Sequence, residues 1–226
     1  MPPSASNIYA SEPLRQLLAD ETAALAPDLQ RCAGDHALHV TVSSYDRPPT
    51  LPMLACWTRL HLAQAGYEGD LRGRADEPLP FADGSFALVL LRHALEVAPS
   101  PQDLLAEAAR VLGPGGVLAL TGMHPASGWL PWLLWRGRHQ ELALNSPFRL
   151  SHWLHRANLT IERIGRTGPL WPASPAAPRG GPLGGGYVLV ARKRRHAALP
   201  ILRLPPVVAA PVAGLASGAR RNAAVR

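Results

Sequence analysis

Two continuous apolar runs, at residues 86–91 and 117–120, form the clearest hydrophobic pattern in the chain. Runs of this length are typical of strands that are buried on both faces. Between them, residues 101–112 repeat apolar side chains at helical spacing, and the glycine–proline turn at residues 113–116 ends the helix. A strand, a helix and a second strand form a right-handed crossover, so we predict that the two strands are parallel neighbours in one sheet.

The rest of the chain repeats weaker versions of these patterns. Ser11 and Pro13 are typical of the start of a helix, and Leu14, Leu17 and Leu18 form its apolar face. Further strands are predicted at residues 37–42, 57–63, 70–74, 159–164 and 187–191, with a short helix at residues 149–157. This alternation predicts an α/β fold with a doubly wound, mostly parallel sheet.

Positive charge is concentrated at the end of the chain. The net charge is +7, but residues 192–226 contain eight basic residues and no acid, which leaves 15 basic and 16 acidic residues elsewhere. Periodicity stops near residue 195, so we predict a domain at residues 1–195 and a disordered tail at residues 196–226. The tail either binds an anionic partner, such as nucleic acid or a membrane surface, or only improves solubility.

The sequence gives no sign of export, a membrane span or a metal site. The start lacks the basic and apolar regions of a signal peptide, and four prolines interrupt the apolar residues 197–216. Cys32 and Cys56 form no CxxC pair, and the histidines show no metal-ligand spacing. We therefore expect a cytoplasmic protein with free thiols and no metal, and a monomer or a weak dimer.

Four motifs in residues 74–193 occur in the order and spacing of one family. Residues 79–86 read LPFADGSF, and residues 104–116 read LLAEAARVLGPGG. Residues 153–159 read WLHRANL, and residues 187–193 read YVLVARK. Together these segments resemble the class I, Rossmann-like S-adenosylmethionine-dependent methyltransferases, in particular the type-11 branch.

The resemblance implies a seven-stranded sheet whose last strand is antiparallel and lies beside the fifth. It also implies that S-adenosylmethionine is the cofactor, that the cofactor lies at the carboxyl ends of the first four strands, and that the methyl acceptor is a small molecule. The sulfonium is already activated, so methyl transfer needs mainly alignment, and a missing general base does not exclude activity.

The cofactor-binding positions implied by the resemblance depart from the family pattern. The glycine-rich loop after the first strand corresponds to Val42, Ser43 and Ser44, and a left-handed non-glycine residue there costs about 1–2 kcal/mol. The acid that binds the ribose is replaced by Gln64, which weakens binding by about 10- to 100-fold. Asp76 remains as the acid for the adenine amino group, one residue closer to the LPF segment than usual. We expect weak cofactor binding, with Asp76 the most sensitive residue.

Residues that follow the fourth and fifth strands are candidates for the active face. Arg92 and His93 are candidates for cofactor contacts, and His93 is also a candidate general base. The alternative is that either residue caps the next helix. His124 is a candidate for orienting the substrate, or it only shapes the turn before Pro125.

Three tryptophans recur every third residue at Trp129, Trp132 and Trp135, with leucines between them. This segment is a candidate lid, in which Trp129 and Trp132 contact the substrate. Packing on the domain and contact with lipid are the alternatives.

Two hypotheses follow for the function. The first is an S-adenosylmethionine-dependent methyltransferase of unknown substrate with a degenerate cofactor-binding loop. The second is a non-catalytic scaffold with the methyltransferase fold, whose basic tail and tryptophan segment bind nucleic acid or a membrane surface. Residues 43–48 discriminate between them, because in a scaffold this loop is expected to fill the cofactor volume.

Overall fold

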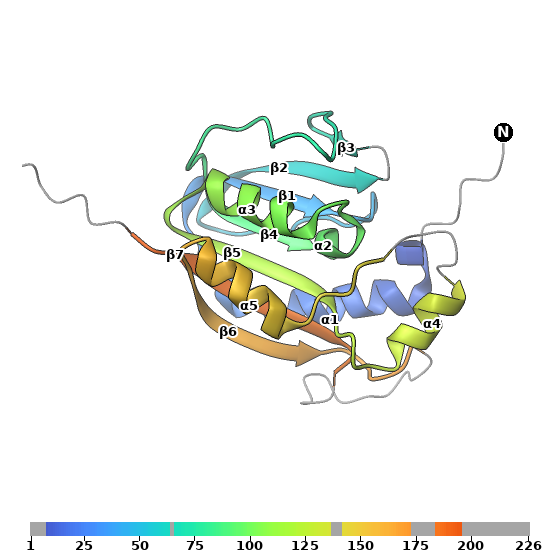
Figure 1. Cartoon of the computed structure of the whole chain (residues 1–226). Coiled ribbons are helices and arrows are strands. Elements are labelled where there is room, and N and C mark those ends of the chain that lie inside the picture. Colours follow the sequence, from blue (N-terminus) through green and yellow to red (C-terminus); the bar gives the residue numbers. More distant parts are fainter. Residues whose placement is uncertain (1–7, 64–65, 137–141, 173–183, 196–226) are drawn as a thin grey trace, which may run out of the picture. The chain divides into compact units, whose positions relative to one another are not determined.

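The computed structural model describes residues 8–63, 66–136, 142–172 and 184–195. The seven strands form one sheet in the order β3-β2-β1-β4-β5-β7-β6 (Figure 1). They are β1 (Gly34–Thr41), β2 (Leu54–Ala63), β3 (Gly66–Gly69), β4 (Phe86–Arg92), β5 (Leu112–Met123), β6 (Leu159–Thr167) and β7 (Gly186–Lys193). After a short 3-10 turn at Ile8–Ala10, the helices are α1 (Glu12–Leu29), α2 (Ala94–Val97), α3 (Pro101–Val111), α4 (Trp129–Arg136) and α5 (Pro147–Arg156).

The two apolar runs pair as the sequence predicts. Leu88 lies opposite Val117 and Leu91 lies opposite Leu120 in a parallel ladder between β4 and β5. The helix α3 connects the two strands. The last strand β7 runs antiparallel between β5 and β6, which confirms the predicted doubly wound fold. The predicted tail lies outside the described residues.

The third strand differs from the prediction in place and direction. The sequence pattern placed it at residues 70–74 in a mostly parallel sheet, but β3 occupies Gly66–Gly69 and runs antiparallel to β2. Only residues 64 and 65 separate the two strands. A connection this short permits a hairpin, whereas a parallel neighbour needs a crossover of about a dozen residues.

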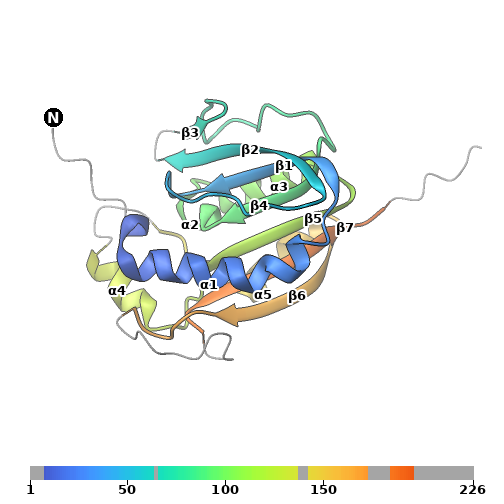
Figure 2. The ribbon, with the colours of Figure 1, turned by 180° about the vertical axis from the view of Figure 1, so that it is seen from behind.

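The connection from β1 to β2 also lacks a helix, although the two strands are parallel. Residues 42–53 cross between them as a loop. Consequently α2, α3 and α5 cover one face of the sheet, and α1 covers the other face over β5, β7 and β6 (Figures 1 and 2). Among the described residues, no helix covers the β1–β2–β3 part of the α1 face, where Arg59 and His61 of β2 lie beside His39 and Thr41 of β1.

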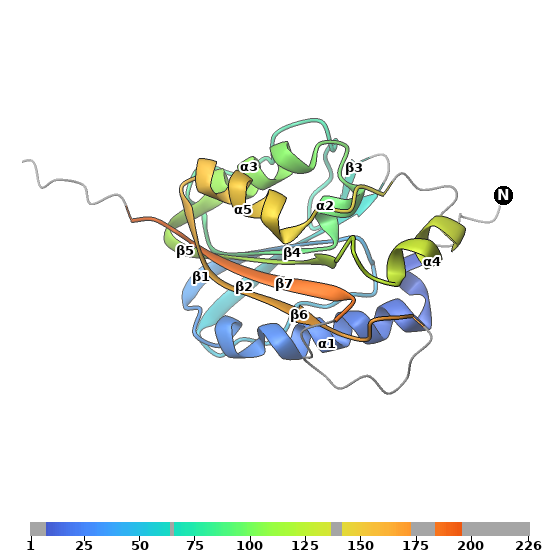
Figure 3. The same cartoon turned by 60° about the horizontal axis from the view of Figure 1, so that its bottom comes forward.

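The apolar core forms on both faces of the sheet and at one edge. The main cluster lies between the sheet and α2, α3 and α5, and a smaller one lies under α1. A third cluster joins Tyr9, Val42, Met123, Trp129 and Leu133, where α4 meets the start of α1 (Figure 3). None of the described helices is long and apolar enough to cross a membrane.

Candidate functional site

The strands β1, β2, β4 and β5 are parallel and end at the same edge of the sheet, at Thr41, Ala63, Arg92 and Met123. Doubly wound sheets bind their ligands at this carboxyl edge. Two features meet there: a polar recess that extends along β1 and β2, and a buried cluster of charged side chains beside β4.

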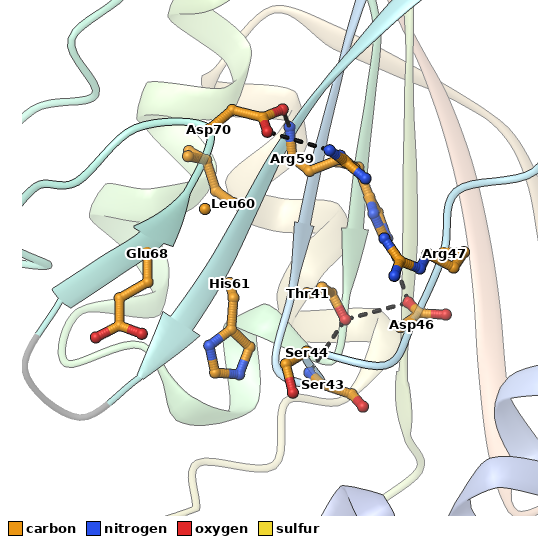
Figure 4. A pocket seen from close by; sticks show the side chains of 12 residues that line it. Thr41, Ser43, Ser44, Asp46, Arg47, Arg59, Leu60, His61, Glu68 and Asp70 are labelled. Carbon is orange, nitrogen blue, oxygen red and sulfur yellow. Dashed lines mark hydrogen bonds and ion pairs between the residues drawn. The ribbon is translucent and has the colours of Figure 1, made fainter.

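The β1–β2 recess has a volume of about 390 Å³, within the range of small-molecule sites. At the carboxyl edge, Ser43 and Ser44 of the loop, His61 of β2 and Glu68 of β3 line it, and Arg59 and Asp70 line its other end (Figure 4). The remaining lining residues are His39, Thr41, Asp46, Arg47, Leu60 and Gly69.

The hairpin brings an acid to this recess that the sequence did not reveal. Glu68 lies directly opposite His61 in the antiparallel ladder between β2 and β3. In Figure 4 the side chains of Glu68, His61 and Ser44 lie near one another at the carboxyl edge. The motif pattern placed the ribose acid at position 64, which lies outside the described residues, and gave no reason to expect a carboxylate from β3.

The loop after β1 is closed by its own side chains. The Thr41 hydroxyl donates to Oδ2 of Asp46 over 3.1 Å, and the backbone N–H of Asp46 donates to the carbonyl of Ser43 over 3.1 Å. The Nε2 of His61 donates to the carbonyl of Val42 over 2.9 Å. No residue of this loop has a positive φ, so the chain avoids the expected left-handed strain by forming a turn different from the family's glycine-rich one.

His93 lies between two buried carboxylates. Its Nε2 is 3.1 Å from Oε1 of Glu21 on α1, and its Nδ1 is 3.1 Å from Oε2 of Glu96 on α2. Glu96 also accepts hydrogen bonds from the Tyr9 hydroxyl at 2.7 Å and from the backbone N–H of Met123 at 2.5 Å. All these side chains are at most 1% exposed.

Arg92 extends the same cluster into the β1–β2 loop. Its guanidinium donates to Oδ1 of Asp46 at 2.9 Å and to the carbonyl of Leu18 at 2.5 Å, and it lies 3.7 Å from Glu21. His39 Nε2 is 3.2 Å from Oδ2 of Asp46 but outside hydrogen-bond geometry. The cluster therefore joins α1, the end of β4, α2 and the loop through side chains that are buried together.

The pKa values of the two histidines in this cluster shift in opposite directions. Burial alone would lower the pKa of His93, but Glu21 and Glu96 outweigh it and raise that pKa to about 10. Burial lowers the pKa of His39, so His39 is neutral at pH 7. Burial would raise the pKa of Asp46, but its contacts with His39 and Arg92 outweigh burial and lower it.

The contacts of His93 with Glu21 and Glu96 make it a poor general base. At neutral pH its imidazole is protonated and buried, with both nitrogens held by carboxylates, which is unfavourable for accepting a proton from a substrate. It stands at the N-cap position of α2 with φ 54°, but its side chain makes no capping hydrogen bond. Arg92 is bound within the cluster and does not line the β1–β2 recess.

The other sequence-predicted residues are dispersed. Asp76 is exposed, pairs with Arg74 at 2.8 Å, and lines a different recess beside α3. Nδ1 of His124 accepts from the N–H of Ala126 over 3.1 Å, as expected of a turn residue. Trp129 is buried in the third apolar cluster and donates to the carbonyl of Pro169 over 2.8 Å.

Trp132 packs edge-on against Trp129, with ring centroids 5.7 Å apart, and belongs to the same packed segment. Neither tryptophan lines the β1–β2 recess. Among the described residues, no group of histidine, cysteine, aspartate or glutamate side chains is arranged to hold a metal ion.

The sheet order and the helices that cover it form the Rossmann-like methyltransferase fold. A family model described as a methyltransferase domain matches residues 52–120, from β2 into β5. Ubiquinone biosynthesis O-methyltransferases of Xanthomonas oryzae pv. oryzae are 31% identical over 138 residues, which cover 56% of this chain and 56% of those proteins. The chain thus spans about half the length of these relatives. An uncharacterized methyltransferase of Synechocystis sp. is 40% identical over 76 residues, 33% of this chain and 34% of that protein.

Solved structures show the same fold. An S-adenosylmethionine-dependent methyltransferase of Thermotoga maritima superposes with a TM-score of 0.57 at 17% identity, covering 80% of this chain and 91% of that one. An S-adenosylmethionine-dependent methyltransferase of Mesorhizobium loti superposes with a TM-score of 0.51 at 14% identity, covering 77% of this chain and 98% of that one. The motifs, the matched segment and the fold all support a class I methyltransferase of the type-11 branch. S-adenosylmethionine is the cofactor of this class.

The described residues fit one end of this cofactor better than the other. The β1–β2 recess offers two serine hydroxyls, an imidazole and a carboxylate, which suit the hydroxyl and amino groups of a nucleoside. Beside β4, by contrast, Glu21, Arg92, His93 and Glu96 are already bonded to one another, and Val42 is packed against apolar side chains. The lining of the β1–β2 recess therefore suits the nucleoside end of S-adenosylmethionine, whereas the side chains beside β4 do not suit its methionine end.

Proposed function

We propose that the protein is an S-adenosylmethionine-dependent methyltransferase that acts on a small-molecule acceptor and binds the nucleoside part of its cofactor in the β1–β2 recess. The observation that carries this proposal is the position of Ser43, Ser44, His61 and Glu68 around a recess at the carboxyl ends of β1 and β2. The names of the Xanthomonas relatives favour a hydroxyl group as the methyl acceptor.

In this proposal Glu68 replaces the acid that the family places at the end of the second strand. Its carboxylate accepts hydrogen bonds from the ribose hydroxyls, and the hydroxyls of Ser43 and Ser44 add further contacts. The bound cofactor would supply an already activated methyl group, so the chain has mainly to hold the two reactants in line.

His93 is a positioning residue in this proposal. Its contacts with Glu21 and Glu96 hold α1 and α2 against the end of β4, and Arg92 holds the loop through Asp46. The cluster thereby fixes the loop that carries Ser43 and Ser44.

One observation favours the alternative of a non-catalytic scaffold. The space beside β4 is occupied by the charged cluster and by the apolar packing of Val42, Met123 and Trp129. In a scaffold this packing is the final state, and no cofactor enters.

A thermal-shift series separates the two functions. S-adenosylmethionine, S-adenosylhomocysteine and adenosine are each expected to raise the melting temperature of the full chain, because a ligand that binds only the folded state stabilises it. Methionine is expected to have no effect. No shift with any of the three nucleosides at millimolar concentration would contradict the proposal and support the scaffold.

A further inference from the structure

A second cleft lies at the amino edge of the sheet, at the opposite end of the strands from the β1–β2 recess. We refer to it as the amino-edge cleft; its volume is about 510 Å³. It is bounded by residues 31–36, which lead into β1 and form its first residues, by residues 84–87 at the start of β4, by residues 113–117 of β5 and by the end of β7. Three arginines line it, at Arg31, Arg192 and Arg195, against one acid, Asp35.

Two of these arginines are available to a ligand. Arg192 is neutralised by Glu162, with Nε and Oε1 2.5 Å apart, and it also donates to the carbonyl of Gly115. Arg31 and Arg195 are exposed, and neither makes a side-chain hydrogen bond or an ion pair with another described residue. Among its described lining residues the cleft therefore has two guanidinium groups without an ion-pair partner and one carboxylate, which is an excess of positive charge.

The glycine turn of β5 makes room for one of these side chains. Gly115 has φ +79°, and a Cβ at this position would lie 2.6 Å from Nε of Arg195. The absence of a side chain thus lets the Arg195 guanidinium lie directly against the turn. Burial raises the pKa of the Cys32 thiol in the same cleft to about 11, so this thiol stays neutral and adds no opposing charge.

We propose that the amino-edge cleft binds a phosphate group through Arg31 and Arg195. Guanidinium groups bind phosphate oxygens with paired, charge-assisted hydrogen bonds, and this geometry favours phosphate over a simple halide. The sequence after Arg195 supports an anionic ligand, because residues 196–226 contain Arg203, Arg220, Arg221 and Arg226 and no acid. The phosphate belongs either to a free small molecule or to a lipid headgroup. This inference does not depend on the proposed methyl transfer.

The test is an NMR titration of the full chain with inorganic phosphate at constant ionic strength, with chloride as the reference anion. Arg31→Gln and Arg195→Gln are each expected to raise the dissociation constant by about tenfold, because each removes one charge-assisted contact. The matched control is Arg156→Gln, which removes an exposed arginine of α5 outside the cleft and is expected to change the constant less than about twofold.

A parallel sedimentation assay identifies the source of the phosphate. It compares vesicles of phosphatidylcholine alone with vesicles that also contain phosphatidic acid. Saturable binding of inorganic phosphate that depends on both arginines supports the site with a free phosphate as ligand. Vesicle binding that depends on the same two arginines, without such a phosphate response, supports the site with a lipid headgroup. If Arg31→Gln and Arg195→Gln behave like Arg156→Gln in both assays, the proposal is overturned.

Discussion

Glu21 lies within α1 with its side chain fully buried, and its carboxylate is shared by His93 and Arg92. Glu21→Gln keeps nearly the same shape and removes only the negative charge. His93 then retains Glu96 at 3.1 Å, and Arg92 retains Asp46 at 2.9 Å. Removing one partner of a buried ion pair lowers the free energy of unfolding by about 3–5 kcal/mol. We expect Glu21→Gln to lie near the lower limit, because His93 and Arg92 each keep another partner.

The same variant should change how stability depends on pH. The pKa of His93 is raised from 6.5 to about 10 in the folded protein, so its contribution to stability is complete below pH 6.5 and is lost as the pH rises through 10. At about 1.4 kcal/mol per pKa unit, the raised pKa of His93 contributes at most about 5 kcal/mol to the free energy of unfolding. Without the Glu21 charge the folded pKa is lower, so the loss of stability still begins near pH 6.5 but ends at a lower pH and is smaller in total.

Urea unfolding of the full chain between pH 6 and pH 10 measures both effects. The matched control is Glu12→Gln in the first turn of the same helix. Its exposed carboxylate pairs with Arg15, and the substitution is expected to change the free energy of unfolding by less than about 0.5 kcal/mol. A Glu21→Gln variant as stable as this control at pH 7, or with the pH profile of the unsubstituted protein, would refute the charged cluster as described.

Three further predictions concern packing and the domain boundary. Gly122→Ala should destabilise the protein by about 1–3 kcal/mol in urea unfolding, because the new Cβ would lie 2.6 Å from the Tyr187 hydroxyl, whereas Gly165→Ala, with 3.5 Å to Val188, should be nearly neutral. Arg110→Gln should speed hydrogen exchange in residues 79–86, because Arg110 donates to the carbonyls of Leu79 and Phe81; unchanged exchange would show that these bonds do not hold the segment. A chain that ends at Arg195 should keep one cooperative melting transition, and its loss would show that residues 196–226 are structural.

The second half of the fold could be predicted because its signals are local. The apolar runs of β4 and β5, the helix between them and the glycine turn each specify their own structure and agree on one topology. The first half could not be predicted in the same way. A two-residue connection turns β3 back along β2, and the pattern of residues 70–74 gave no indication of that turn.

The candidate site was harder to predict because its parts meet through tertiary contacts. Val42, Ser43 and Ser44 do follow the first strand, as expected, but the loop is closed by Asp46, whose partner Arg92 lies 46 residues further on. Glu68 reaches the recess only because β3 is antiparallel. Asp76, predicted to be the most sensitive cofactor residue, pairs with Arg74 and lines another recess, so the cofactor placement proposed above does not include it.

Calorimetric titration of the full chain with S-adenosylhomocysteine tests the placement of the cofactor most directly. The β1–β2 recess predicts saturable binding that Glu68→Gln weakens by about 5- to 30-fold, because one charge-assisted contact is lost at an exposed position. Asp76→Asn, which removes another exposed charge that lies outside the recess, should leave the dissociation constant within about twofold. Binding that is lost in Asp76→Asn and unchanged in Glu68→Gln, or no heat of binding at millimolar ligand, would contradict this placement.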